Sequence, residues 1–228
     1  MVCFIDLFLL LYPSKVFIVV STREQKSAQI KTSVYKAFAT MVSKSSYVDV
    51  HVNHICNKVN ISKVTFFKYF HQKEDVLRYF FRVWCLQRAI EYKQTPLSGR
   101  ESINHLFEKM SDTYLKYPGV TSCFVNYISR FKVPLKPVNL TALEKKALFP
   151  KVQDVASIKI VSIQQMVENF VLEAIFNNEI GKSSDVKGIA DLLLCLLFGT
   201  SFVSSIRNIG QPRMFYRRNL ALIFDSLK

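Results

Sequence analysis

The sequence predicts an all-α protein in which an N-terminal three-helix bundle is followed by a larger helical domain. From Thr22 onward the apolar residues recur at steps of three and four, which is the helical period, and no window alternates as a half-buried strand does. Half of the side chains are hydrophobic, and six glycines and seven prolines in 228 residues are too few for a fibrous or disordered chain. The chain is therefore expected to be globular, with a substantial core.

Residues 1–20 form an apolar extension that we set apart from the fold. Asp6, Pro13 and Lys15 interrupt it, so no charge-free stretch reaches the thickness of a membrane. A secretion signal is not expected either, because the first charge is Asp6 rather than a basic residue. Two interpretations stay open: a tethering or partner-binding helix, and an extension without a part in the fold, which we favour.

The N-terminal domain, residues 21–72, is expected to hold three helices. The first covers about Thr22–Val42, with one apolar stripe for burial. The second covers Val52–Val59, about two turns, and Asp49 is placed to cap it. The third covers Ser62–Phe70 and is aromatic and basic.

The second and third helices have the spacing of a helix-turn-helix. Asn60 tolerates a left-handed backbone and is expected to form the turn, and Ser62 is expected to cap the third helix. Phe66 and Phe70, four residues apart, are placed for burial. The residues left facing outward on the third helix are Lys63, Thr65 and Lys68, as in a helix that enters the major groove of DNA.

The run from residue 55 to 70 is ICNKVNISKVTFFKYF, followed by KEDVL at 73–77. It resembles the DNA-binding signature of the TetR (tetracycline-repressor-like) family of transcription regulators, over about residues 30 to 77. Three positions depart from the family pattern: Asn60 and Val64 replace glycines, and Phe67 replaces a phosphate-binding tyrosine. We expect binding to depend more on lysine because Phe67 has no hydroxyl group.

The resemblance implies a set of DNA contacts on the second and third helices and at the start of the next. Val64 is placed either to contact a thymine methyl group or to crowd the groove, and Lys73 is expected to hold a phosphate at a helix N-terminus. Phe67 and Tyr69 are interpreted equally well as core rings. The full expected set is Asn53, Ser62, Lys63, Val64, Thr65, Phe67, Lys68, Tyr69 and Lys73.

The charge favours a polyanionic partner. Lysine and arginine number 31 against 17 acidic residues, a formal charge of +14, which indicates nucleic acid or an anionic membrane surface. Residues 21–94 carry a net +8 and residues 95–228 a net +6, so the charge is densest around the motif. If each of two protomers neutralises about four phosphates, the logarithm of DNA affinity should fall with that of salt at a slope of about −7.

No metal, cofactor or catalytic site is expected. His51, His54 and Cys56 are close in sequence, but their spacing on a short helix is unsuited to a metal and no fourth ligand follows. The five cysteines are isolated and odd in number, so we expect reduced thiols in a cytoplasmic protein. Glycine-rich phosphate loops and the common nucleophile motifs are missing, which argues against an enzyme.

Residues 73–228 are expected to form a helical regulatory and dimerisation domain. Helices are predicted at about 73–92, 98–117, 120–131, 152–178, 184–208 and 212–227, with a break at Pro134 and Pro137 and a loop or short helix at 140–150. The last two helices, about 184–208 and 212–227, resemble the four-helix dimer interface of the family. A homodimer would let two recognition helices bind a palindromic operator.

The resemblance also implies a small apolar or aromatic effector that shifts the helix from Lys73 to Tyr92 and releases a repressor from double-stranded DNA. The alternative function is a basic helical protein that binds membrane surfaces or partners without specific DNA recognition. The residues proposed for the effector pocket are apolar and lie on several helices: Phe80, Trp84, Phe107, Tyr114, Phe124, Tyr127, Met166 and Phe170.

Overall fold

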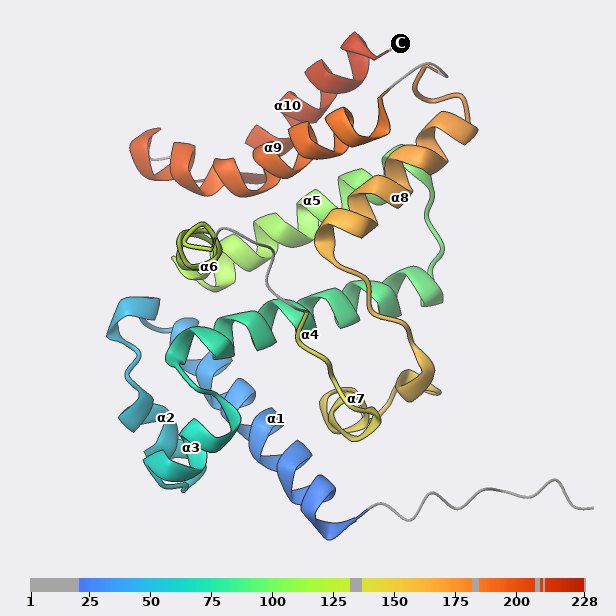
Figure 1. Ribbon diagram of the computed structural model, residues 1–228. Coiled ribbons are helices and arrows are strands. Elements are labelled where there is room, and N and C mark those ends of the chain that lie inside the picture. Colours follow the sequence, from blue (N-terminus) through green and yellow to red (C-terminus); the bar gives the residue numbers. More distant parts are fainter. Residues whose placement is uncertain (1–20, 132–136, 182–184, 208–209, 211, 228) are drawn as a thin grey trace, which may run out of the picture.

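The computed structural model describes residues 21–131, 137–181, 185–207, 210 and 212–227. These residues form ten α-helices and two short 3-10 helices and include no strand, which confirms the all-α prediction (Figure 1). The apolar extension 1–20, the break at Pro134 and the predicted helix ends at 184 and 208 lie outside the described residues. The α-helices are α1 (Thr22–Val42), α2 (Val52–Val59), α3 (Lys63–Tyr69), α4 (Lys73–Gln94), α5 (Gly99–Lys116), α6 (Val120–Ile128), α7 (Ala142–Leu148), α8 (Ile163–Phe176), α9 (Val186–Arg207) and α10 (Pro212–Ser226).

The helices α1, α2 and α3 pack together at one end of the molecule, at the lower left of Figure 1. A capping box fixes the start of α1, because the Ser21 hydroxyl accepts from the Glu24 amide while the Glu24 carboxylate accepts from the Ser21 amide. Asp49, expected to cap α2, lies instead in the 3-10 helix Tyr47–Asp49, and His51 takes the cap position of α2 without a side-chain hydrogen bond.

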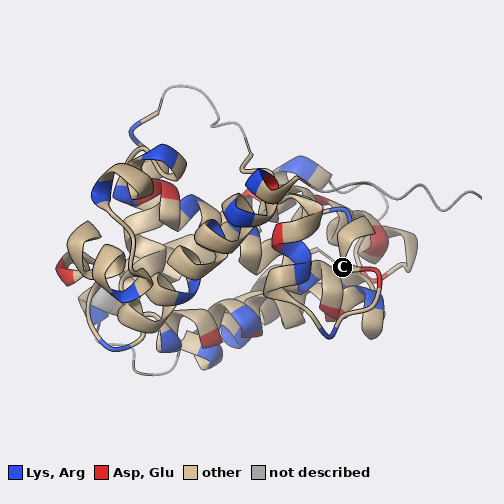
Figure 2. Cartoon of the chain, turned by 90° about the horizontal axis from the view of Figure 1, so that it is seen from below, with Lys and Arg blue, Asp and Glu red and all other residues tan. Residues whose placement is uncertain are grey.

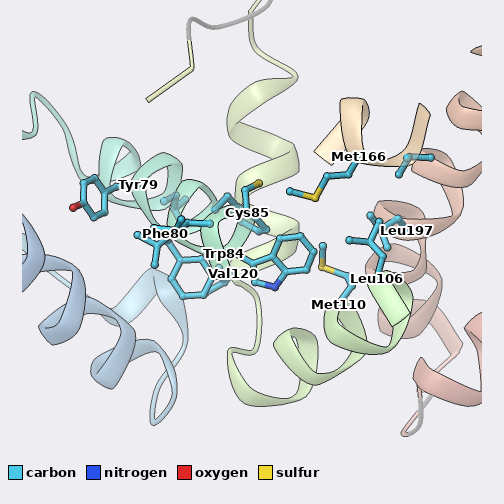
Figure 3. Close-up of a cluster of buried hydrophobic side chains, with 14 of the residues drawn as sticks. Tyr79, Phe80, Trp84, Cys85, Leu106, Met110, Val120, Met166 and Leu197 are labelled. Atoms are coloured by element: carbon cyan, nitrogen blue, oxygen red, sulfur yellow. The ribbon is translucent and has the colours of Figure 1, made fainter. Parts of the chain in front are cut away.

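The central helix α4 joins this end of the molecule to the rest. Its 22 residues are buried on several sides, and one continuous apolar core extends from α1 to α10 around it. Figure 3 shows Phe80, Trp84 and Cys85 of α4 packed with Met110 of α5 and Met166 of α8. Burial raises the pKa of the Cys85 thiol to about 12, so this cysteine stays protonated at neutral pH.

The helix predicted at 152–178 is wrong over residues 152–162, because α8 starts only at Ile163. Before it the chain forms the 3-10 helix Val155–Ser157. Side chains from elsewhere bind the carbonyl groups of this segment: Lys145 donates to those of Ala156 and Ile158, and Arg82 of α4 donates to those of Ile160 and Val161. These tertiary hydrogen bonds replace the helical ones that the apolar period had suggested.

The C-terminal helices pack against α5. Helix α5 contacts α8 on one side and α10 on another, and α9 packs on α8 and α10 (Figure 1). The Tyr216 hydroxyl of α10 donates to the Leu197 carbonyl of α9 at 2.7 Å, and its ring meets the edge of Phe107 of α5 at 5.0 Å. Tyr216 therefore ties three helices together.

Candidate DNA-binding interface

The turn between α2 and α3 adopts the left-handed conformation that the sequence predicted. Asn60 has φ 57° and ψ 52°, and the amide of Ile61 donates to the Cys56 carbonyl at 3.0 Å. The Ser62 hydroxyl then accepts from the Thr65 amide at 3.1 Å and lies 2.9 Å from the Thr65 hydroxyl. The predicted turn and cap are both confirmed, and together they fix the direction in which α3 leaves α2.

Two phenylalanines hold α3 against the body of the protein. Phe66 is fully buried and its ring lies 5.6 Å from that of Phe70, which in turn meets the edge of Tyr79 on α4 at 5.7 Å. Ile55 and Cys56 of α2 are buried in the same core. The orientation of α3 is therefore set by aromatic packing beneath it, which leaves its opposite face free.

The free face of α3 combines apolar and basic side chains. Val64 is 81% exposed and Phe67 is 44% exposed, and both Lys63 and Lys68 point to solvent. Figure 2, drawn from below Figure 1, shows basic positions distributed over many helices of the molecule. Asn53, on the exposed side of α2, belongs to the same surface. Helix α3 is thus a short helix at the surface of the molecule, with exposed lysine side chains on its free face.

Three of the expected DNA contacts are less free than predicted. Lys73 is the clearest difference: its ammonium group donates to the carbonyls of Tyr47 and Val50, at 3.1 and 3.0 Å, and lies 4.1 Å from the centre of the Tyr47 ring. It closes the segment between α1 and α2 instead of reaching outward to a phosphate. Tyr69 is half-buried against the core, and the hydroxyl of Thr65 is engaged by Ser62.

Two histidines that we had considered only for metal binding lie on this surface. His51 and His54 are exposed at the start of α2, with their rings edge to face at 5.3 Å. Cys56 points the other way, into the core. Their position at the start of α2 was visible in the sequence, where a metal site was rejected and no other role was assigned to them.

The eight residues expected around an effector do not line one cavity in the described part of the chain. Phe80, Trp84 and Met166 lie in the apolar cluster of Figure 3. Phe107 packs on α10, away from this cluster, while the Tyr127 hydroxyl accepts from Gln72 at 2.8 Å. The remaining three are distributed likewise: Phe124 stacks on Phe81, Phe170 meets Tyr92, and Tyr114 is half-buried on α5. Apolar periodicity identified core residues here, and an effector pocket among them stays a prediction.

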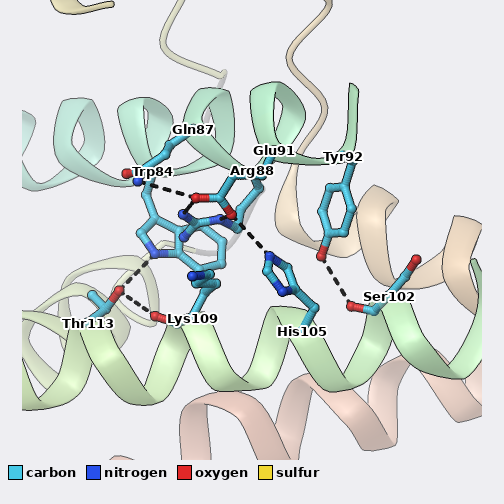
Figure 4. A network of polar contacts seen from close by, with 9 residues as sticks. All are labelled: Trp84, Gln87, Arg88, Glu91, Tyr92, Ser102, His105, Lys109 and Thr113. Atoms are coloured by element: carbon cyan, nitrogen blue, oxygen red, sulfur yellow. Dashed lines mark hydrogen bonds and ion pairs between the residues drawn. The ribbon is translucent and has the colours of Figure 1, made fainter. Parts of the chain in front are cut away.

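A polar network that the sequence did not reveal joins α4 and α5 (Figure 4). Arg88, only 3% exposed, donates to both carboxylate oxygens of Glu91, and a His105 ring nitrogen lies 3.1 Å from the same carboxylate. The guanidinium of Arg88 lies over the Trp84 ring, whose nitrogen donates to Thr113 at 2.8 Å. Burial raises the pKa of Glu91, but the hydrogen bond and charge of Arg88 outweigh it, so the pKa lies below its usual value.

The last two helices expose five large apolar side chains among the described residues. On α9 these are Leu192, Phe202 and Ile206, and on α10 they are Met214 and Leu222. By length and hydropathy Val186–Ser204 of α9 is also the one described segment that could cross a membrane. Core helices of soluble proteins have the same composition, and α9 packs on α8, α6 and α10. Its apolar character is thus divided between the core and an exposed strip.

No family model matches the sequence, and no curated protein is similar to it in sequence. Solved structures are similar in fold. A TetR transcription regulator from Haloarcula marismortui superposes with a TM-score of 0.57 at 12% identity, covering 87% of this chain and 98% of that one. The reduced form of NemR from E. coli gives 0.53 at 13% identity, covering 87% and 98%.

A third similar structure is FadR from Bacillus subtilis in complex with stearoyl-CoA, with a TM-score of 0.50 at 14% identity, covering 84% of this chain and 96% of that one. These matches extend over both the helix-turn-helix end and the helices that follow it. At such low identities they establish architecture rather than ancestry of individual residues. The chain therefore has the fold of TetR-type transcription regulators.

Proposed function

We propose that this protein is a sequence-specific DNA-binding transcription regulator that binds a palindromic operator as a homodimer. The observation that carries the proposal is the short helix α3, which is seated on Phe66 and Phe70 and presents Lys63, Val64 and Lys68 to solvent. A helix held from beneath and free above is what insertion into a major groove requires.

The exposed side chains of α3 have two proposed roles in DNA binding, one electrostatic and one apolar. Lys63 and Lys68 supply positive charge for phosphates or for the acceptor edge of guanine. Val64 has no polar atom and suits apolar contact with a thymine methyl group. Phe67 has the ring but not the hydroxyl of the tyrosine in the TetR family pattern. The hydrogen bond of that tyrosine to a DNA phosphate is therefore replaced by apolar contact with a DNA sugar. The segment around Lys73 contributes indirectly, because that lysine braces the chain between α1 and α2.

The homodimer is supported by the exposed apolar strip on α9 and α10. Phe202 and Ile206 are each about two-thirds exposed in the single chain. Apolar side chains of this size gain most from burial against another surface, at about 25 cal/mol per Å². A two-fold interface through these helices would place two copies of α3 on one face of the DNA.

Repression relieved by a small ligand is the proposed mode of action, in a cytoplasmic protein without enzymatic activity. The FadR structure, which is described as a complex with stearoyl-CoA, is an example of this fold with a bound small molecule. Helix α4 connects α3 with the helices behind it, so a ligand that shifts α4 changes the spacing of the two recognition helices. The sign of regulation is tested by reporter output with and without the protein.

The DNA-binding proposal is tested by selection of random duplex DNA on the purified full-length protein, followed by fluorescence anisotropy with the enriched sequence. Lys68→Ala should weaken specific binding by about tenfold or more, since it removes a charged contact. Lys187→Ala, which removes another exposed lysine, at the start of α9, is the matched control and should leave affinity unchanged. Failure to enrich any sequence, together with binding to anionic vesicles, would favour the membrane-surface alternative.

A further inference from the structure

A groove between α5 and α10 lies apart from the DNA-binding surface and from the cluster of Figure 3. Its volume is about 340 Å³, which is at the small end for a ligand site. Three arginines line it, Arg100 of α5 and Arg213 and Arg217 of α10, against a single acidic lining residue, Glu108. We propose that this groove binds a small organic anion, a carboxylate or phosphate monoester with an apolar body.

The groove follows from the register of two antiparallel helices. Arg213 pairs with Asp112 at 2.6 Å, and one turn further along α10 Arg217 pairs with Glu108. Continued by one more turn, this register places Asn104 opposite Ala221. The side chain of Ala221 is too short to fill the space between the helices, and the hollow opens at this point. It is thus bounded by the Asn104 amide and by the guanidinium groups on either side.

The three arginines differ in their partners. Arg213 and Arg217 form ion pairs with carboxylates, whereas the Arg100 guanidinium forms none among the residues that the structure describes; the Glu179 carboxylate binds Arg100 only at its backbone amide, at 2.8 Å. The Arg100 guanidinium instead lies over the Phe224 ring at 4.3 Å, which holds the group flat beside the hollow. A planar guanidinium donates two parallel hydrogen bonds to a carboxylate or phosphate, so Arg100 is the natural anchor for an anion.

The floor of the groove is apolar and favours a ligand that carries an apolar body beside its anionic group. Phe107 of α5 and Tyr216, Leu220 and Phe224 of α10 are all buried beneath the arginines. These side chains are already shielded from water, so covering them adds little burial; the apolar lining instead offers a ring or short alkyl chain van der Waals contacts that a bare inorganic anion lacks. The groove therefore fits an amphipathic anion better than a free ion or a neutral molecule.

Such a ligand would join α5 to α10, because it bridges Arg100 on one helix and Arg217 on the other. Helix α10 also carries Met214 and Leu222 of the proposed dimer surface. An anion in the groove would fix α10 on α5 and so act on the arrangement of the dimer. This consequence rests on the proposed function, whereas binding itself does not.

The test is isothermal titration of the full-length protein without DNA, using phenyl phosphate and benzoate, with benzamide as the neutral analogue of the same shape. The anions should bind at least tenfold more tightly than benzamide, and Arg100→Gln should weaken anion binding on the order of tenfold. Arg130→Gln, which removes an exposed arginine at the end of α6, should have no effect.

Equal affinity for benzamide, unchanged binding by Arg100→Gln, or no binding of either anion would overturn the proposal. Circular dichroism melting of each variant shows whether it is folded, and Arg217→Gln provides a second variant on the opposite wall. Binding of phenyl phosphate but not benzoate would assign the groove to phosphate esters. Because DNA is absent from these titrations, their failure leaves the DNA-binding proposal to its own test.

Discussion

The carboxylate of Glu144 ties α7 to both α1 and α4, and its removal should be costly. Glu144 is fully buried in the first turn of α7. It accepts from the Thr141 amide at 2.6 Å within a capping box, pairs with Lys31 of α1 at 3.3 Å, and accepts from the Tyr79 hydroxyl of α4 at 3.3 Å. Three elements distant in sequence therefore meet at one side chain.

The effect of Glu144→Ala follows from what each partner loses. Loss of half a capping box costs about 1 kcal/mol. The buried Tyr79 hydroxyl would lose its acceptor, at about 1–3 kcal/mol. Lys31 is 26% exposed and regains water, so its ion pair adds only about 0.5 kcal/mol. We expect the free energy of unfolding to fall by about 3 kcal/mol, which corresponds to a Tm lower by roughly 6–12 °C.

The assay is urea unfolding followed by the fluorescence of Trp84, the single tryptophan, which is buried beside α5. Glu144→Gln keeps only one acceptor oxygen, for either the Tyr79 hydroxyl or the Thr141 amide, and should lose an intermediate amount, about 2 kcal/mol. Glu101→Ala, an exposed glutamate in the first turn of α5, is the matched control. A loss below 1 kcal/mol for Glu144→Ala, or equal losses for the alanine and glutamine variants, would refute this reasoning.

Three further outcomes are expected. Phe66→Ala removes the ring beneath α3 and should lower the free energy of unfolding by about 3–5 kcal/mol in the same urea assay; a change under 1 kcal/mol would mean that other residues seat the helix. Ile206→Asp places a charge in the exposed strip of α9, so analytical ultracentrifugation should show monomers where the unaltered protein is dimeric, and persistence of the dimer would exclude this surface. Because the pKa of Glu91 lies below its usual 4.5 in the folded state, its stabilising contribution is complete above that value and is lost as pH falls through the lower one. Glu91→Gln should therefore flatten the fall of Tm between about pH 5 and 3, and an acid profile identical to that of the unaltered protein would contradict the role of Arg88.

Local chemistry accounts for the parts of the fold that the sequence predicted well. The bounds of α1, the turn at Asn60 and the cap at Ser62 each depend on residues within a few positions of one another. The burial of Phe66 follows from its spacing to Phe70 on a single short helix. Such features depend on interactions between neighbouring residues and not on tertiary packing, so they can be predicted from the sequence.

What the sequence did not predict depends on partners far along the chain. Lys73 was expected to face DNA because nothing nearby indicates that the carbonyls of Tyr47 and Val50 will surround its ammonium group. Glu144 is buried although charged residues are usually exposed, since its partners Lys31 and Tyr79 come from other helices. Arg88 is also buried, but it pairs with Glu91, three residues further along its own helix. The sequence also could not distinguish a pocket from the core, because the same apolar period describes a packed core and a cavity wall.

The exposed Val64 side chain in the first turn of α3 has a consequence for the binding of methylated DNA. Val64 can offer a DNA base only methyl groups, so it would recognise the base by shape rather than by hydrogen bonding. In 5-methylcytosine the added carbon occupies the edge of the major groove that the thymine methyl group occupies. If α3 enters the major groove as proposed, we expect Val64 to contact both methyl groups alike, so that methylation of a cytosine in the bound DNA would strengthen binding.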